Sequence, residues 1–156
     1  MADAVKHRAR GMVVANPLWL AGDGLGISAG DPDAEHTFAY DPTTLLTKGK
    51  PFFIQSVNLH MHYLGSRGRV AIHRGDGSWD CLIDVADWDY HWASYYQLAQ
   101  PVEFRPGDLL YVECHWDNSA ANQVPAMGVV PAPRDLHWAT AEEMCAGVML
   151  YTDTWP

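Results

Sequence analysis

The sequence predicts an all-β protein, an antiparallel β-sandwich of the jelly-roll type. Short apolar runs alternate with Gly, Pro and Asp along most of the 156 residues. Turn signals recur about every 8–12 residues, a spacing typical of sandwiches and barrels. No segment sustains the 3.6-residue hydrophobic period of a helix over three turns, which argues against a helical bundle. A chain of this length can bury one good core, so we expect a single domain.

The N-terminal part of the sequence has no clear strand pattern, and the first clear strand comes later. Residues 1–11 are polar and predict a disordered or loosely ordered segment that precedes a domain over residues 12–156. The stretch "PFFIQSVNLHMH", residues 51–62, is the clearest strand. Because side chains alternate across a strand, it should present two different faces. One face would carry Phe53, Val57, Leu59 and Met61, and the other Ile54, Asn58, His60 and His62.

The second half of the chain predicts further strands joined by turns. Gly75–Asp76–Gly77 separates "RVAIHR" from "WDCLIDV" and predicts a hairpin, because Gly and Asp tolerate positive φ. After "YYQLAQPVEF" and the turn "RPGD", residues 109–116 form another strand. Residues 117–135 are rich in Pro and Asn and predict a long loop, and residues 144–152 predict a last strand.

Charge and composition narrow the function classes. The net charge of −9 argues against nucleic acid or an anionic membrane as the main partner. No apolar run approaches the roughly 20 residues needed to span a bilayer. The start of the chain lacks the apolar region of a signal peptide, so the expectation is a cytoplasmic protein as the sequence stands, or an exported or periplasmic one if a leader has been removed.

His60 and His62 are the first candidate for a functional site. Two residues apart on a strand, both imidazoles leave the same face and can chelate one metal ion. The alternative is two polar residues on a solvent face. Neutral imidazole suits copper, zinc, iron and nickel, so the pair alone does not select the metal. The sequence has no second H-x-H, no H-E-x-x-H, no nucleophile elbow, no P-loop and no dinucleotide fingerprint.

The chain has three cysteines, Cys81, Cys114 and Cys145, with no C-x-x-C pairing. An odd number without paired spacing favours three buried thiols on composition alone.

A longer set of elements carries a family resemblance. The run from "HMHYLG" to "ECHWDNSAANQ", followed after the proline-rich loop by "HWATAEEMC", resembles the C-terminal domain of the copper type II, ascorbate-dependent monooxygenases, especially their bacterial single-domain members. The resemblance covers about residues 52–152 and implies a jelly-roll sandwich with one copper ion. It places the copper ligands on His60, His62 and Met144. A thioether is a soft, neutral ligand, which suits Cu(I).

The resemblance also implies a disulfide between Cys114 and Cys145, with Cys81 left as a free buried thiol. If the two bonded cysteines face each other, their neighbours His115 and Met144 project from the opposite side. His115 then becomes a candidate for a fourth ligand or for a residue that bonds to a ligand. The alternative is an ordinary exposed strand histidine.

The sequence departs from the best-known family members in two respects. They carry a second copper on three histidines in a preceding domain, whereas His7 and His36 here stand alone. Either electrons come from another protein or a small reductant, or the full hydroxylation cycle does not run. The peptide-amidating members hold a peptide carboxylate with an arginine and a tyrosine, at positions occupied here by Asn58 and Val148. A glycine-extended peptide is therefore not the expected substrate. Four tryptophans are candidates for a pocket near the copper, or else for the core: Trp88, Trp92, Trp116 and Trp138.

The expected function is that of a copper-dependent monooxygenase-like oxidoreductase. It would activate O2 for C–H hydroxylation or a related oxidation of an unknown small molecule, with ascorbate or another external reductant as electron donor. The alternative is a non-catalytic copper-binding protein, such as a carrier, buffer or sensor. A third reading is an interaction module that keeps a vestigial site.

Overall fold

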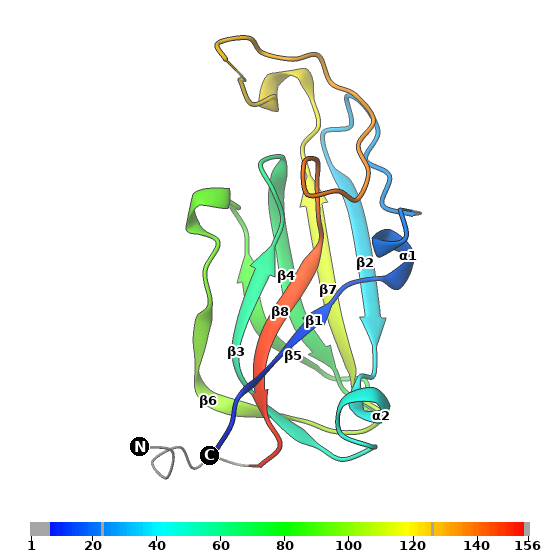
Figure 1. Ribbon diagram of the computed structural model, residues 1–156, viewed down its shortest axis with the longest axis vertical. Coiled ribbons are helices and arrows are strands. Elements are labelled where there is room, and N and C mark those ends of the chain that lie inside the picture. The colour runs from blue at the N-terminus through cyan, green and yellow to red at the C-terminus, as the bar shows by residue number, and fades with distance from the viewer. Residues whose placement is uncertain (1–6, 23, 126, 155–156) are drawn as a thin grey trace.

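The computed structural model describes residues 7–22, 24–125 and 127–154. Two four-stranded antiparallel sheets pack face to face (Figure 1). The first sheet has the order β1-β8-β3-β6 and the second the order β2-β7-β4-β5. The strands are β1 (Arg10–Val14), β2 (Ala34–Tyr40), β3 (Phe52–His60), β4 (Gly65–His73), β5 (Trp79–Val85), β6 (Tyr96–Phe104), β7 (Leu109–Trp116) and β8 (Ala146–Thr152).

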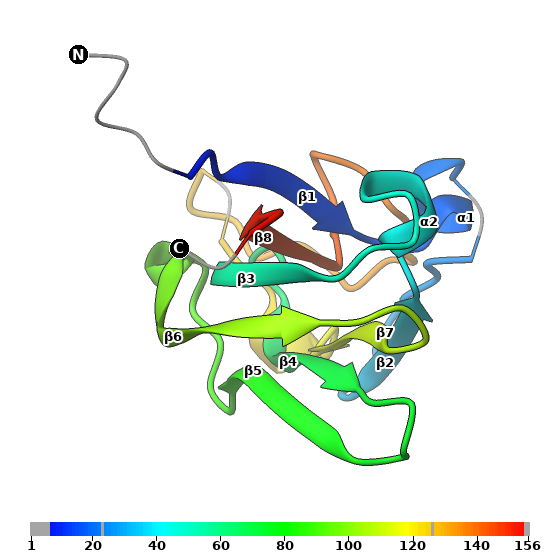
Figure 2. The same cartoon turned by 90° about the horizontal axis from the view of Figure 1, so that it is seen from below.

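This strand order is that of a jelly roll, which confirms the predicted fold class. Each sheet combines strands from the two halves of the chain, as Figure 2 shows for β8, which lies between β1 and β3. The short helical pieces lie in the connections: α1 (Pro17–Leu20), α2 (Thr43–Leu46), η2 (Tyr90–Trp92) and η3 (Ala120–Asn122). Among the described residues, no helix has the length and apolarity to cross a membrane.

The hydrophobic core lies between the sheets and is rich in aromatic rings. Phe52 and Phe104 stack with their ring centroids 4.9 Å apart, and Tyr151 packs on Phe52. Trp116 is fully buried. Large aromatic side chains each remove a large apolar area from water, so these four rings contribute much of the burial energy.

A β-bulge in β3 explains one error of the sequence-based prediction. The pairing register shifts between Ile54 and Ser56, which resets the alternation of side chains. Ile54 is therefore fully buried, whereas Phe53 is only half-buried. Beyond the bulge the alternation holds, with Val57 and Leu59 in the core as predicted.

Three further predictions need correction. The predicted N-terminal segment ended at residue 11, yet Arg10 already belongs to β1; residues 1–6 lie outside the described residues. The last strand begins at Ala146, two residues later than predicted. Cys81 is free, as expected, but it is exposed rather than buried, because it lies on edge strand β5.

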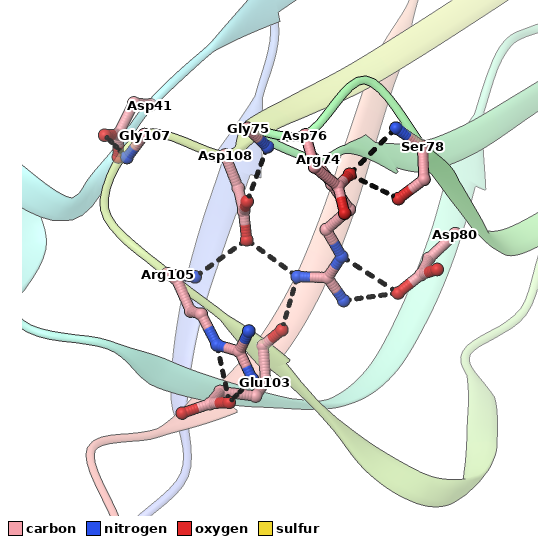
Figure 3. A network of polar contacts seen from close by, with 10 residues as sticks. All are labelled: Asp41, Arg74, Gly75, Asp76, Ser78, Asp80, Glu103, Arg105, Gly107 and Asp108. Atoms are coloured by element: carbon pink, nitrogen blue, oxygen red, sulfur yellow. Dashed lines mark hydrogen bonds and ion pairs between the residues drawn. The ribbon is translucent and has the colours of Figure 1, made fainter.

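A network of polar contacts links the β4–β5 and β6–β7 turns (Figure 3). The guanidinium of Arg74 donates to Asp108 at 2.7 Å and to the carbonyl of Glu103 at 2.8 Å, and it also pairs with Asp80. The carboxylate of Asp108 additionally accepts from the backbone N–H groups of Arg105 and Gly75. With its side chain only 8% exposed, Asp108 joins the two turns from a position largely out of water.

We expect Asp108→Asn to lower the free energy of unfolding by about 1–2 kcal/mol, because an amide cannot accept all of these bonds. Burial raises the pKa of the Asp108 carboxyl, but the bonds from Arg105 and Arg74 outweigh it and the pKa lies below its ordinary value. A lowered folded pKa means that this stabilisation is present above the unfolded pKa and is lost as the pH falls through the folded pKa. Urea unfolding at several pH values measures both effects.

The matched control for this prediction is Asp80→Asn, since Asp80 pairs with the same guanidinium from a half-exposed position. Exposed ion pairs contribute roughly 0–1 kcal/mol, so this variant should change stability little. Equal losses in the two variants would contradict the role assigned to Asp108.

Candidate metal centre

His60 and His62 lie side by side where β3 ends. Both positions follow the outward-facing alternation of the strand, and their ring centroids are 5.1 Å apart with the ring planes at 87°. His60 is half-buried and His62 is 9% exposed. The predicted chelating arrangement of two imidazoles on one face is therefore present in the structure.

Hydrogen bonding leaves nitrogen lone pairs on both rings. Nδ1 of His62 lies 2.9 Å from the carbonyl oxygen of Glu142, which can only accept, so Nδ1 carries the proton and Nε2 is the free donor atom. The ring of His60 has no hydrogen bond to any other described residue. Burial, with a smaller contribution from the nearby His62, lowers the pKa of His60 and favours its neutral, metal-binding form.

The register of β3 and β8 brings the segment that carries Met144 to this pair. His60 pairs with Ala146, so two residues further along the antiparallel chains Met144 falls opposite His62. The contact between His62 and Glu142 shows that the two chains continue side by side past the ends of the strands. Met144 is half-buried. The structure thus brings together the segments that carry all three predicted ligands.

A buried carboxylate that the sequence did not single out holds this region in place. Glu143 is 1% exposed and accepts bonds from the backbone N–H groups of His62 (2.9 Å) and Leu64 (2.8 Å) and from the indole N–H of Trp116 (2.9 Å). Burial raises the pKa of Glu143. Its role depends on long-range contacts, and the only sequence signal was its place beside Met144.

The segment after β5 packs against the other side of the pair. The indole N–H of Trp88 donates to the carbonyl of His62 at 3.0 Å, and Tyr90 meets the His62 ring edge-on at a centroid distance of 6.0 Å. Gly65 leaves room for this indole, since a Cβ there would lie 2.7 Å from it. These contacts fix the backbone around His62 from two directions.

The disulfide between Cys114 and Cys145 is present, as the resemblance implied. The two Cα atoms are 5.9 Å apart and both residues are fully buried between the sheets. Cys114 belongs to β7 of the second sheet and Cys145 directly precedes β8 of the first. The bond therefore ties the residue next to Met144 to the opposite sheet.

The prediction for His115 is wrong. Cys114 and Cys145 bridge the core from opposite sheets, so their neighbours project from opposite outer faces of the sandwich. His115 leaves the outer face of the second sheet, where it contacts Asp33, Arg67 and Glu113. It takes no part in the surroundings of His60 and His62.

The tryptophans are divided between several environments. Only Trp88 contacts the histidine pair. Trp116 is a core residue that also bonds to Glu143. Trp138 stacks on Trp19 at 6.3 Å, and Trp92 is 75% exposed. The four tryptophans do not meet in one pocket. The alternative, a role in the core, holds for Trp116, and Trp88 and Trp138 pack against that core.

The two positions at which the sequence departs from the peptide-amidating enzymes are direct neighbours. Asn58 pairs with Val148 across β3 and β8, two residues from the His60–Ala146 pair and on the same face. The Asn58 amide donates to the carbonyl of Ser94 at 2.6 Å, and Val13 of β1 pairs with Val148 on its other side. The surface beside the histidines is thus uncharged at these positions.

Two comparisons with known proteins bear on this site. The family model described as copper type II ascorbate-dependent monooxygenase, C-terminal domain, matches residues 40–155. The search of curated proteins found no match to the chain. The family match spans most of the sequence and includes both histidines, Met144 and the disulfide. The chain therefore belongs to the copper type II ascorbate-dependent monooxygenase family, through its C-terminal domain.

Proposed function

We propose that the protein holds one copper ion with His60, His62 and Met144, and that it oxidises a C–H bond of a small molecule with O2 and electrons from an external reductant such as ascorbate. The observation that carries the proposal is the pair of imidazoles on one face at the end of β3, with the Met144 segment bonded beside them. The family membership supports copper as the metal.

The donor set fits this metal. His62 offers Nε2 because its Nδ1 proton is bound to Glu142, and the neutral form of His60 is favoured by burial. Two imidazoles suit copper but also zinc, whereas the thioether of Met144 favours reduced copper. When bound, copper would supply the redox chemistry of O2 activation.

The surrounding residues orient the ligands and limit the access of water. The Glu142 carbonyl selects the tautomer of His62, and Glu143 and Trp88 hold its backbone from two sides. Bonds of this kind around a metal ligand typically change metal affinity or activity 10–100-fold when they are lost. Asn58 and Val148 beside the site are uncharged, so they offer no partner for a substrate carboxylate. This supports a substrate that has no carboxylate next to them.

One observation favours a carrier or buffer as a second candidate function. Among the residues that the structure describes, no three histidines come together, so a second copper of the three-histidine kind has no place in this part of the chain. Catalytic turnover would then depend on electrons supplied by another protein or a small reductant. A protein that only stores or delivers Cu(I) would need no such electrons.

Replacement of Met144 tests the proposal. Met144→Leu should lower the affinity for Cu(I) strongly, by about tenfold or more, as competition with a colorimetric Cu(I) chelator would show. The matched control is Met127→Leu, because Met127 is fully exposed and lies in the long loop. Unchanged Cu(I) affinity in Met144→Leu would contradict the ligand assignment.

Oxygen consumption separates the two candidate functions. With copper and ascorbate, an oxidase-type site should consume O2 even without substrate, and His60→Ala should abolish this consumption. His73→Ala is the matched control, since His73 stacks on Trp79 in the other sheet. Tight copper binding without any oxygen consumption would favour the carrier.

A further inference from the structure

The outer face of the second sheet carries another set of ligand atoms. Glu35 of β2, Glu113 and His115 of β7 each offer one such atom, and these atoms lie within 4.8 Å of one another. Glu35 pairs directly with His115 across the two strands, and Glu113 precedes His115 by two residues on the same face. The spacing of Glu113 and His115 repeats, on the second sheet, the spacing of His60 and His62 on the first.

We propose that Glu35, Glu113 and His115 bind a divalent cation of the zinc type. Zinc binds imidazole nitrogens and carboxylate oxygens, and a site with three protein ligands leaves a fourth position for water. The proposal is independent of the copper site, because none of these residues contacts the histidine pair.

The carboxylates of Glu113 and Glu35 each have an oxygen with few or no other contacts. One oxygen of Glu113, Oε2, accepts from Arg69 (3.0 Å) and from Tyr111 (2.6 Å), whereas Oε1 faces only Nε2 of His115 at 3.1 Å. The Glu35 side chain is exposed and makes no hydrogen bond or ion pair among the described residues, although the charge of Arg67 acts on it from a distance. For a cation to bind, Oε1 of Glu113 therefore gives up only its contact with His115, and the Glu35 carboxylate gives up no hydrogen bond.

His115 is the anchor of the site. Its side chain is 7% exposed, so the ring is buried and the surrounding residues fix its orientation. Nδ1 lies 3.2 Å from a carboxylate oxygen of Asp33 and 2.9 Å from Nη2 of Arg67. A carboxylate beside the second ring nitrogen is a usual partner of a metal-binding histidine. Without a cation Nδ1 accepts from Arg67, so Asp33 is the group that would accept an Nδ1 proton once a cation occupied Nε2.

Cation binding would move one proton within the His115 ring. Without the cation, Nε2–H donates to Glu113 and Nδ1 accepts from Arg67. With the cation on Nε2, the proton would sit on Nδ1 and be donated to Asp33. Nη2 of Arg67, which lies 2.9 Å from Nδ1 and is also a donor, would turn away from the ring, while Nη1 keeps its 2.8 Å contact with Asp33. The ring loses a proton from one nitrogen and gains one on the other, so the step balances.

The local charge favours a cation. Asp33, Glu35 and Glu113 contribute three negative charges, against two positive charges from Arg67 and Arg69. Glu35 is the carboxylate that no arginine contacts, and it lies against the other two ligands. Hard carboxylate ligands also give this site a preference opposite to that of a thioether site for Cu(I).

The test combines zinc titration with NMR of the imidazole nitrogens. Zinc added to the protein with reduced copper already present should bind in one further equivalent and should move the His115 proton from Nε2 to Nδ1. Glu35→Gln and His115→Gln should each remove that equivalent, and Asp33→Asn should weaken it about 10–100-fold. Glu103→Gln and His73→Gln are the matched controls and should leave it unchanged.

Several results would overturn the proposal. These are no zinc binding beyond the copper site, zinc binding that Glu35→Gln leaves unchanged, or zinc binding with the His115 proton still on Nε2. Because Glu35 is exposed, Glu35→Gln should fold normally, and its circular dichroism spectrum verifies this. If the protein failed to bind copper but bound zinc in this way, the proposed copper function would be contradicted and the zinc site would stand.

Discussion

Replacing Cys114 and Cys145 together by alanine should lower the free energy of unfolding by about 3–4 kcal/mol. The disulfide closes a loop with a sequence separation of 31 residues, and a cross-link of that size restricts the unfolded chain by roughly this amount. It also joins the two sheets through the middle of the core, with both cysteines fully buried. Urea denaturation followed by tryptophan fluorescence measures the loss.

The same variant should also weaken Cu(I) binding, because Cys145 positions the neighbouring Met144. Cys81→Ala is the control: Cys81 is exposed and free, so the change should stay within about 0.5 kcal/mol. Treatment of the wild-type protein with a reductant should reproduce the double variant. If reduction left both stability and Cu(I) affinity unchanged, the structural role of the disulfide would be refuted.

Glu143→Ala should destabilise the fold by about 3–5 kcal/mol and should impair copper binding. The change leaves three donors without their acceptor, the N–H groups of His62 and Leu64 and the indole of Trp116, and each buried unsatisfied group costs about 1–3 kcal/mol. Two of these donors lie in the segment that carries His62, one of the proposed copper ligands. Thermal unfolding and Cu(I) competition, measured on the same preparation, report the two effects.

A conservative variant of Glu143 separates its role in positioning His62 from its contribution to the stability of the fold. Glu143→Gln keeps the size and one carbonyl oxygen, so it should retain most of the fold while loosening His62. Glu142→Gln is the matched control, since its side chain bonds Arg134 and the backbone of His137 at the surface. If Glu142→Gln impaired copper binding as strongly as Glu143→Gln, the specific role of the buried carboxylate would be wrong.

The alternation of side chains predicted much of the fold and the geometry of the histidine pair. The faces of β3 follow from its pattern beyond Ser56, and His60 and His62 share a face for the same reason. Before Ser56 the prediction failed, because a bulge changes the register without leaving a mark in the pattern of apolar residues.

The remaining errors concern contacts between distant parts of the chain. The alternation at Cys114 placed His115 correctly outside the core but could not show that the bonded cysteines lie in different sheets, so that His115 and Met144 point apart. The role of Glu143 was equally hidden, since a glutamate in a polar segment gives no sign of burial. Its contacts with His62 join residues 81 positions apart in the sequence.

X-ray absorption spectroscopy of the protein loaded with one equivalent of Cu(I) tests the copper assignment most directly. The first coordination shell should contain two imidazole nitrogens and one sulfur. In Met144→Leu the sulfur should disappear while the nitrogens remain, and in Met127→Leu the spectrum should match that of the wild type. A wild-type spectrum without a sulfur ligand, or one that Met144→Leu leaves unchanged, would contradict a copper site formed by His60, His62 and Met144.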